Sequence, residues 1–462
     1  MLFEFHAVRL GQSLKTLALA ALTTTCLTAP AFAQQTQIWT LVAGSATPDA
    51  GPVYSGLTPH PGARFGAATW TDSQGNLWLF GGATSDIHFR NDLWKYTMST
   101  GKWSYVTGTQ TVNDNGNYII GANMRPAARA HAATAVDSAG RLWLFGGHGP
   151  AANWQGDRND IWLFDTVQAK WEYRKGSGIN DIAGDYPATP GTPGGTPGGR
   201  RASIGWIDTT NNVWVYGGQG FGSVPQSRGA LADLWRFRPS WNDWTFTNGS
   251  NLINQYAVYP ALPSPPTLHP GSRYDMVGWA NGNDLWMFGG YYQGYLSDLW
   301  RYNVTTQNWV FIDGFTELNA QSIHPAATGQ PGGMPGGRVF ASSWKDKAGK
   351  LWMFGGEFRL PGGTTGALSS ELWMYDPTAA GGQGHWIIKS DLTKAVNAPG
   401  VYSGPVGSMY PGARKGAAAW TDQAGDLWMY GGRAYGAAGG GNLSDLWKYT
   451  TLSTVGEWKV YE

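Results

Sequence analysis

Arginine recurs at six positions, each three residues after a proline: Arg64, Arg129, Arg200, Arg273, Arg338 and Arg414. A guanidinium group can hold a carboxylate or a phosphate through two parallel hydrogen bonds. Six such groups brought to one place would form a binding site for an anionic ligand. The alternative is structural, because a residue that is repeated in every copy of a motif can brace each copy by bonding to loop carbonyl groups.

Two titratable residues follow glycine pairs directly. Glu357 comes after Gly355-Gly356 and is a candidate general base, and His148 comes after Gly146-Gly147 and is a candidate acid–base group. No histidines show a metal-ligand spacing such as H-E-x-x-H. We therefore predict no metal site and no cofactor, and the sequence displays no complete catalytic constellation.

A third group of candidates consists of aromatic residues that are not repeated: Trp154, Tyr291, Tyr292 and Tyr435. Aromatic faces beside polar groups suit sugars or a protein surface. Their departure from the repeat favours a role in ligand binding, and the alternative is that they pack the loops over the rest of the fold.

These residues belong to six near-copies of one sequence repeat. Each copy contains Leu-Trp-x-Phe-Gly-Gly, then Asp-Leu-Trp-x-Tyr, then a single Trp. In the first copy, residues 64–70, 77–80, 92–96 and 103–106 read as four short strands separated by turn residues. A period of several tens of residues with recurring aromatics indicates an array, and four strands per copy indicate a β-propeller blade. We expect the aspartate before each third strand to accept hydrogen bonds from loop N–H groups. The glycine pairs that end the second strands begin at Gly81, Gly146, Gly217, Gly289, Gly355 and Gly431.

The double glycine followed by spaced Tyr and Trp resembles the kelch-repeat family. The resemblance covers about residues 35–462 and implies an all-β, six-bladed kelch-type β-propeller with four-stranded antiparallel blades. It also brings the chain close to the central domain of galactose oxidase, whose copper radical chemistry requires a cysteine crosslinked to tyrosine. The only cysteine is Cys26, inside the N-terminal segment that we expect to be removed. Copper radical chemistry is therefore excluded for the mature chain.

The predicted blades lie near residues 61–107, 126–175, 197–248, 270–313, 335–390 and 411–462, within one domain from 34 to 462. An extra strand is expected at 37–43. Its Trp39 and the C-terminal Trp458 both fit the outermost position of the last blade. We predict that one of these terminal strands fills that position and the other is displaced, because a strand that completes the last sheet closes the ring without an exposed edge.

Residues 1–33 read as a signal peptide. Basic residues precede a short apolar run, and Ala31-Phe32-Ala33 is a typical cleavage pattern. We expect a secreted or periplasmic protein, cleaved after Ala33, without a membrane span. The formal net charge of +1 and the 14% content of charged residues argue against a nucleic-acid partner. We expect a monomer.

Strand direction alternates within a blade, so the loops that enter the first strands and those that follow the glycine pairs emerge on one face. Both kinds are long, and long loops on a rigid scaffold are where binding and catalysis usually occur. We call this the long-loop face.

Three functions remain open from the sequence. The first is recognition of a glycan or protein ligand on the long-loop face. The second is suggested by resemblance to exported six-bladed kelch propellers, and is mutarotation or epimerisation of a sugar acid such as sialic acid. The third is a structural role in surface assembly.

Overall fold

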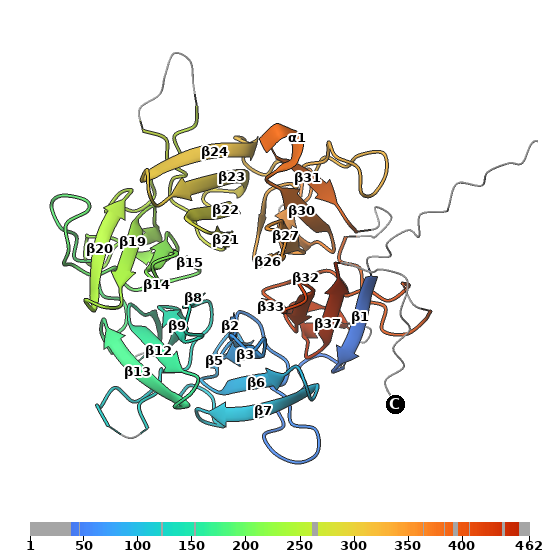
Figure 1. Ribbon diagram of the computed structural model, residues 1–462, viewed down its shortest axis with the longest axis horizontal. Helices are drawn as coiled ribbons and strands as arrows, with labels where there is room; N and C mark the ends of the chain where they lie inside the picture. Colours follow the sequence, from blue (N-terminus) through green and yellow to red (C-terminus); the bar gives the residue numbers. More distant parts are fainter. Residues whose placement is uncertain are drawn as a thin grey trace, which may run out of the picture.

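The computed structural model describes residues 38–451, apart from 46, 122, 152–153, 261–266, 364, 383, 391–395, 406 and 437–438. The predicted signal peptide, its cleavage site, Cys26 and Trp458 lie outside the described residues. Among those that are described, strands dominate, and they form six four-stranded antiparallel sheets arranged around a centre (Figure 1). The prediction of an all-β propeller is confirmed.

The sheets follow one another around the ring in chain order, and each begins with its innermost strand (Figure 1). The innermost strands neighbour one another in a closed circle, from β2 through β8, β15, β21, β26 and β33 back to β2. In chain order the blades are β2(Ala68–Thr71), β3(Leu77–Phe80), β6(Leu93–Thr97), β7(Lys102–Thr107); β8(Ala133–Val136), β9(Leu142–Phe145), β12(Ile161–Asp165), β13(Lys170–Lys175); β15(Ile204–Ile207), β16(Val213–Tyr216), β19(Leu234–Arg238), β20(Asp243–Asn248); β21(Val277–Asn281), β22(Asp284–Tyr291), β23(Tyr295–Asn303), β24(Asn308–Phe315); β26(Ser342–Lys345), β27(Leu351–Phe354), β30(Leu372–Asp376), β31(His385–Ile388); and β33(Ala418–Thr421), β34(Leu427–Tyr430), β37(Leu446–Thr450), β1(Ile38–Ala43).

Each second strand is buried on both faces because it lies between two neighbouring blades. Successive side chains of a strand point to opposite faces of the sheet. In β3, Leu77 and Leu79 therefore pack against the sixth blade, whereas Trp78 and Phe80 pack against the second. The indole of Trp70 on β2 adds a polar link, because its Nε1 atom donates to the carbonyl of Trp143 in the second blade over 2.9 Å. Alternate large apolar residues thus join the blades in both directions.

The glycine pair is needed where one blade meets the next. Gly81 and Gly82 have φ values of 64° and 90°, in the left-handed region that favours glycine. A Cβ atom on Gly81 would lie 2.6 Å from the carbonyl oxygen of Arg129 in the second blade. The N–H of Gly82 donates to that same oxygen over 2.9 Å. The pair therefore ends β3 and joins its blade to the following one.

The last blade is completed by the N-terminal strand. β1 pairs with β37 in antiparallel register, with Trp39 opposite Tyr449. Trp39 is 8% exposed and its ring lies 5.4 Å from that of Phe354 in the fifth blade. Strand β1 thus occupies the outer position of the sheet that also holds β37, and this pairing closes the ring.

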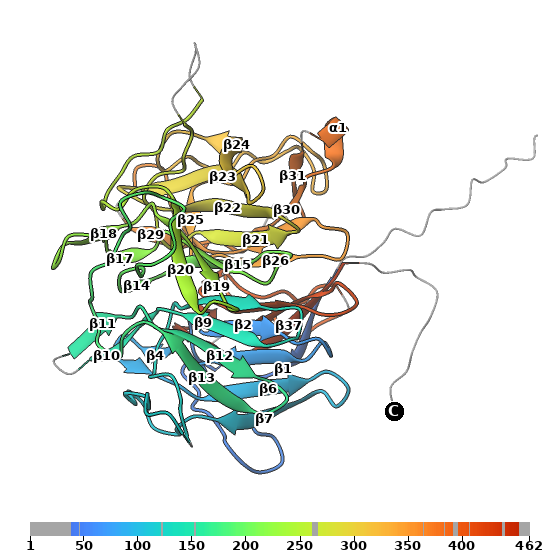
Figure 2. The same cartoon turned by 60° about the vertical axis from the view of Figure 1, so that its left-hand side comes forward.

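Beyond the glycine pairs, the chain forms added hairpins on one side of the ring. In Figure 2, β10, β11, β17 and β18 lie on one side, whereas α1 (Ala379–Gly382), which connects a third strand to a fourth, lies on the other. In the fourth blade, β22 and β23 themselves extend beyond the glycine pair and form the added hairpin, with Tyr291 opposite Tyr295. The remaining hairpins are β4(Ala83–Ser85) with β5(His88–Phe89); β10(His148–Ala151) with β11(Trp154–Asp157); β14(Arg200–Arg201) with β17(Gln219–Phe221) and β18(Arg228–Ala230); β25(Arg338–Val339) with β28(Glu357–Arg359) and β29(Gly366–Leu368); and β32(Arg414–Lys415) with β35(Arg433–Gly436) and β36(Gly439–Asn442).

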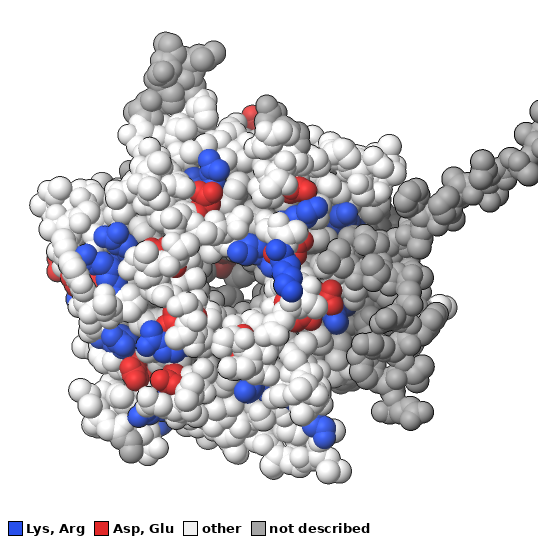
Figure 3. Space-filling model, viewed as in Figure 1, with Lys and Arg blue, Asp and Glu red and all other residues white. Residues whose placement is uncertain are grey.

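A channel runs along the axis of the ring, and its opening is visible at the centre of the space-filling view (Figure 3). The innermost strands line a cavity of about 550 Å³ there, largely with alanine, serine, threonine and glycine. Small side chains suit these strands because six of them converge on one axis. The hairpins of the long-loop face surround one mouth of this channel.

Candidate ligand site at the channel mouth

The six repeated arginines lie inside the blades and not at the channel mouth. In the second blade, Nη1 of Arg129 donates to Oδ1 of Asp160 over 2.6 Å and to the carbonyl of Gly146 over 2.8 Å, and Nη2 donates to Oδ2 of Asp160 over 2.8 Å. At most 2% of each of these arginine side chains is exposed. The prediction that they bind a ligand is therefore wrong, because carboxylates of the same blade occupy their donors. The pairs are Arg64–Asp92, Arg129–Asp160, Arg200–Asp233, Arg273–Asp298, Arg338–Glu371 and Arg414–Asp445.

The carboxylate in each pair accepts further hydrogen bonds from side chains. Oδ2 of Asp160 accepts from Nε1 of Trp162 and from the hydroxyl of Tyr118, each over 2.7 Å. We refer to this Arg–carboxylate–Trp unit as the brace. The repeated aspartates therefore serve the brace, and not the loop N–H groups that we expected. The third partner of the carboxylate, after the arginine and the tryptophan, comes from the loop that enters each blade. In chain order these partners are Tyr54, Tyr118, Tyr186, Tyr259, His324 and Tyr402.

Two residues after each repeated arginine, the backbone forms a closed ring of hydrogen bonds around the channel. The N–H of His131 donates to the carbonyl of Gly66 over 2.8 Å, and each equivalent residue bonds in the same way to the preceding blade until Gly66 itself bonds to Gly416. Every member has a positive φ between 56° and 65°. This mouth ring consists of Gly66, His131, Ala202, Asp275, Phe340 and Gly416. The same backbone hydrogen bond is repeated in all six blades, but the side chains of the ring differ from blade to blade.

Three members of the mouth ring with large side chains line a cavity of about 450 Å³ on the long-loop face. His131, Asp275 and Phe340 share this cavity with Arg201 and Tyr274. The imidazole of His131 lies 5.3 Å from the ring of Phe340, between ring centroids. The volume is typical of a site for a small organic ligand. We call this cavity the mouth site.

Burial shifts the pKa of both titratable members of the mouth ring towards the uncharged form. Burial raises the pKa of Asp275 well above its usual value, although Arg201 and Lys415 act in the opposite direction. Burial also lowers the pKa of His131 to about 3, and Arg201 adds to this effect. No hydrogen bond to the Asp275 carboxyl group is found among the described residues. A carboxyl group with a raised pKa and no hydrogen-bond partner in the described part of the chain thus faces the mouth site.

Arg201 supplies a positive charge to the same cavity. Its Nε and Nη2 atoms donate to Oε1 of Gln219 over 3.3 and 3.0 Å, and Nε lies 4.0 Å from Oδ1 of Asp157. Nη1 has no hydrogen-bond partner in the described part of the chain, and the side chain is 32% exposed. Arg201 therefore retains a donor for an anionic ligand, unlike the arginine of the brace that precedes it.

His148 lines the mouth site, but both of its ring nitrogens have protein partners. Nδ1 lies 2.7 Å from Oδ1 of Asp157, and Nε2 lies 3.1 Å from Oε1 of Gln155. The other oxygen of Asp157 accepts from Nε of Arg228 over 2.7 Å. The geometry makes His148 part of a hydrogen-bonded cluster at the wall of the cavity, which orients it but leaves no ring nitrogen for acid–base work.

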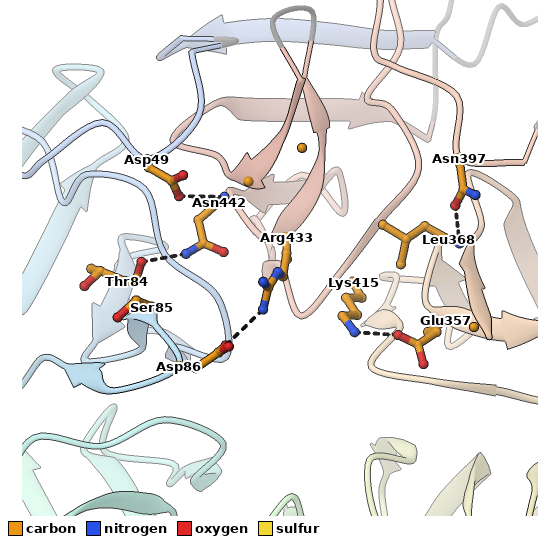
Figure 4. A pocket seen from close by; sticks show the side chains of 13 residues that line it. Asp49, Thr84, Ser85, Asp86, Glu357, Leu368, Asn397, Lys415, Arg433 and Asn442 are labelled. Atoms are coloured by element: carbon orange, nitrogen blue, oxygen red, sulfur yellow. Dashed lines mark hydrogen bonds and ion pairs between the residues drawn. The ribbon is translucent and has the colours of Figure 1, made fainter.

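Glu357 is held in a similar way on the opposite side of the mouth. Its Oε1 atom accepts from the hydroxyl of Tyr295 over 2.6 Å, and its Oε2 atom accepts from Nζ of Lys415 over 2.5 Å (Figure 4). Burial raises the pKa of Glu357, but these two hydrogen bonds outweigh it, so the net shift is downwards. A carboxylate with a lowered pKa and two donors is a weak base. We therefore place Glu357 among the residues that position Lys415, and not as the general base we expected.

The predicted aromatic residues divide into two groups. The ring of Tyr291 lies 5.5 Å from that of Tyr274, which lines the mouth site, and 5.4 Å from that of Tyr295. Tyr292 belongs to the periphery, since its hydroxyl donates to the carbonyl of Asn254 over 2.7 Å on the loop that enters the fourth blade. Trp154 and Tyr435 lie on β11 and β35, and their side chains are outside the described part of the structure.

The residues that matter most at the mouth site are absent from our sequence-based candidates. Arg201, Tyr274 and Asp275 lie one or two residues after a repeated arginine, and the repeat predicts a role for that arginine and not for the residues that follow it. The sequence did hold a signal, since the position two residues after that arginine is glycine or alanine in three copies but aspartate in the fourth. A charged residue at a position that is small in half of the copies marks a departure from the repeat.

No helix in the described ranges has the length and apolar character required to cross a bilayer. Residues 52–255 match the family described as the KLHDC2/KLHL20/DRC7 Kelch-repeats domain. Among solved structures, the chain is similar to one titled "Structure of YjhT", with 13% sequence identity and a TM-score of 0.52, and the likeness covers 85% of this chain and 96% of that one. At this identity the likeness concerns the fold alone. None of the curated proteins matches the chain. The kelch-repeat match over residues 52–255 and the ring of four-stranded sheets agree, and they confirm the prediction of a β-propeller.

Proposed function

We propose that this protein binds a sugar acid, a carbohydrate unit that carries a carboxylate, at the mouth site. The observation that supports the proposal is the combination, in one cavity of about 450 Å³, of the open Nη1 atom of Arg201, the carboxyl group of Asp275, whose pKa is raised by burial, and the ring of Tyr274. An arginine binds a carboxylate through charge-assisted hydrogen bonds. A protonated carboxyl group donates to a sugar oxygen, and a tyrosine face packs against sugar C–H groups.

The shape of the site favours a glycan over a protein ligand. Stable protein interfaces bury about 800 Å² on each partner, and they centre on exposed anchor residues. Here the distinctive side chains line a concavity around the channel axis, where a small ligand or the end of a chain fits. We further propose that the protein works after export, in the secreted or periplasmic location that its N-terminal sequence predicts.

The test is a binding measurement with a panel of acidic and neutral monosaccharides, by calorimetry or ligand-observed NMR. We expect binding of at least one acidic sugar and none of its neutral analogue. Arg201→Met should weaken that binding about 10- to 100-fold, as expected for loss of a charge-assisted hydrogen bond. The matched control is Arg141→Met, because Arg141 is similarly exposed at 39% but lies in a turn between first and second strands, on the opposite face. Equal effects of the two substitutions would reject the mouth site.

A second candidate function is mutarotation of the same sugar acid, which the raised pKa of Asp275 favours. In the acid-catalysed step, the protonated Asp275 would give its proton to the ring oxygen while the bond from that oxygen to the anomeric carbon breaks. The anomeric hydroxyl would lose its proton to solvent water, and ring closure reverses both transfers. Exchange spectroscopy on the two anomers would test it. Acceleration by the protein that disappears in Asp275→Asn supports catalysis, and no acceleration by the native protein leaves binding alone.

A further inference from the structure

A second cavity lies beside the mouth site on the long-loop face. It has a volume of about 590 Å³ and is formed by the hairpins of the fifth and sixth blades together with the loop after β4 (Figure 4). Leu368 projects into it from β29, and Gly440 and Gly441 of β36 form part of its wall. We call this cavity the trough.

The trough offers neutral hydrogen-bonding groups and carboxylates, and each basic side chain in its described lining has a carboxylate partner. Its lining includes the side chains of Thr84, Ser85, Asn397 and Asn442. Asp49, also in the lining, accepts from the N–H of Asn442 over 2.9 Å and has no basic partner among the described residues. Hydroxyl groups of an uncharged sugar can donate to such oxygens, whereas a second carboxylate on the ligand would be repelled.

The basic side chains of the trough are held at its edge in ion pairs. Arg433 Nη1 lies 3.0 Å from Oδ1 of Asp86, and Lys415 Nζ lies 2.5 Å from Oε2 of Glu357. Arg433 and Asp86 are 48% and 76% exposed, so water competes with their pairing and the contact is weak.

The trough and the mouth site adjoin each other, because Ser85 and Asp86 line both cavities. The mouth site carries the open donor of Arg201, and the trough carries Asp49 and the amide groups. This difference in charge between adjoining cavities would orient a ligand that is acidic at one end and neutral beyond it.

We propose that the trough is a second subsite that binds an uncharged sugar, so that the ligand is an acidic oligosaccharide whose charged end lies in the mouth site. This inference rests on the proposed function, since it takes the mouth site as the position of the acidic unit. It goes further in that it assigns the length and the polarity of the ligand.

The experiment compares acidic monosaccharides with oligosaccharides that carry the same unit at one end, namely N-acetylneuraminic acid with sialyllactose and glucuronic acid with glucuronyl-xylose. Calorimetry on the full chain should give at least a tenfold tighter Kd for the oligosaccharide of one pair. Leu368→Trp, which fills the trough, should remove this gain and change the Kd of the monosaccharide by less than twofold. Leu368→Met is the matched control and should retain the gain, and thermal melting checks that both variants fold.

The possible failures are distinguishable. Equal affinities for monosaccharide and oligosaccharide in the native protein would overturn the second subsite while leaving the proposed function intact. A gain that persists in Leu368→Trp would also overturn it, because the added sugar would then lie elsewhere. Lactose or xylose binding as tightly as the acidic oligosaccharide would overturn the assigned orientation. Absence of binding to every acidic sugar would reject the proposed function, and the subsite with it.

Discussion

Arg200 and Arg201 are consecutive residues of the same type with opposite environments. Arg200 is fully buried and donates to both oxygens of Asp233, at 2.6 and 2.8 Å, as the brace of the third blade. Arg201 points to the other side of β14, is 32% exposed and lines the mouth site. The first has an equivalent in every blade, whereas the second is replaced by Phe65, Ala130, Tyr274, Val339 and Lys415 elsewhere. Repetition in this ring therefore marks residues that hold the blades, and departure from it marks the site.

The same contrast holds within the mouth ring. Six identical backbone hydrogen bonds close the circle, yet the side chains include a histidine, an aspartate and a phenylalanine. The repeated backbone provides a rigid frame, and the single substitutions on it provide the chemistry. The braces and the mouth site can thus be perturbed separately, which allows the comparison to be tested.

The largest expected effect is on stability when a brace is broken. Arg200→Met leaves the carboxylate of Asp233 buried without its charge partner, and we expect the free energy of unfolding to fall by about 3–5 kcal/mol. Arg201→Met removes an exposed charge and should change the free energy of unfolding by less than about 1 kcal/mol. Chemical denaturation of both variants measures the difference. Similar losses at the two positions would mean that burial does not separate their roles.

A second prediction concerns pH and Asp275. Burial raises the pKa of Asp275 in the folded state. The pKa of an aspartate in an unfolded chain is about 3.9. At pH values above this, the folded state therefore binds more protons than the unfolded state. The free energy of unfolding of the native protein should therefore fall as the pH rises from there to the folded pKa, by up to about 1.4 kcal/mol per pH unit from this group. Asp275→Asn does not titrate, so its stability relative to the native protein should increase with pH.

The measurement is urea denaturation of both proteins at a series of pH values. At pH values below the unfolded pKa both side chains are neutral, and the difference between the proteins should become independent of pH. A difference that stays constant over the whole series would show that Asp275 titrates normally, and its role as a donor in the mouth site would be lost.

The smallest predicted effect compares two glycines of the mouth ring. Gly66 and Gly416 have φ values of 65° and 62°, so alanine at either position should cost about 1 kcal/mol from backbone conformation. A Cβ atom on Gly66 would also lie 2.6 Å from the imidazole of His131, whereas one on Gly416 would meet nothing closer than 3.5 Å. Gly66→Ala should therefore lower the melting temperature more than Gly416→Ala and weaken ligand binding. Equal melting temperatures and affinities would show that His131 moves aside freely.

The braces illustrate how far sequence reasoning reaches. The Pro-x-x-Arg segments, the glycine pairs and the Asp-Leu-Trp segments predicted the strands and the blade order, because repeated apolar spacing dictates which faces are buried. Whether the arginines met a ligand or a carboxylate of their own blade remained open, since Arg129 and Asp160 are brought together only when the hairpin between them folds back. The pairing of Glu371 with His324, in place of an aspartate with a tyrosine, also became visible only in the folded blade.

By itself the sequence determined the all-β class, the repeated unit and the propeller ring, because each of these depends on contacts between neighbouring strands that every copy encodes. The tertiary structure decided the site. The residues that line the two cavities come from different blades and lie far apart in the sequence, as do Asp86, Arg201, Asp275 and Lys415. Only closure of the ring, with β1 beside β37, brings such distant positions to one mouth, and only burial there raises the pKa of Asp275.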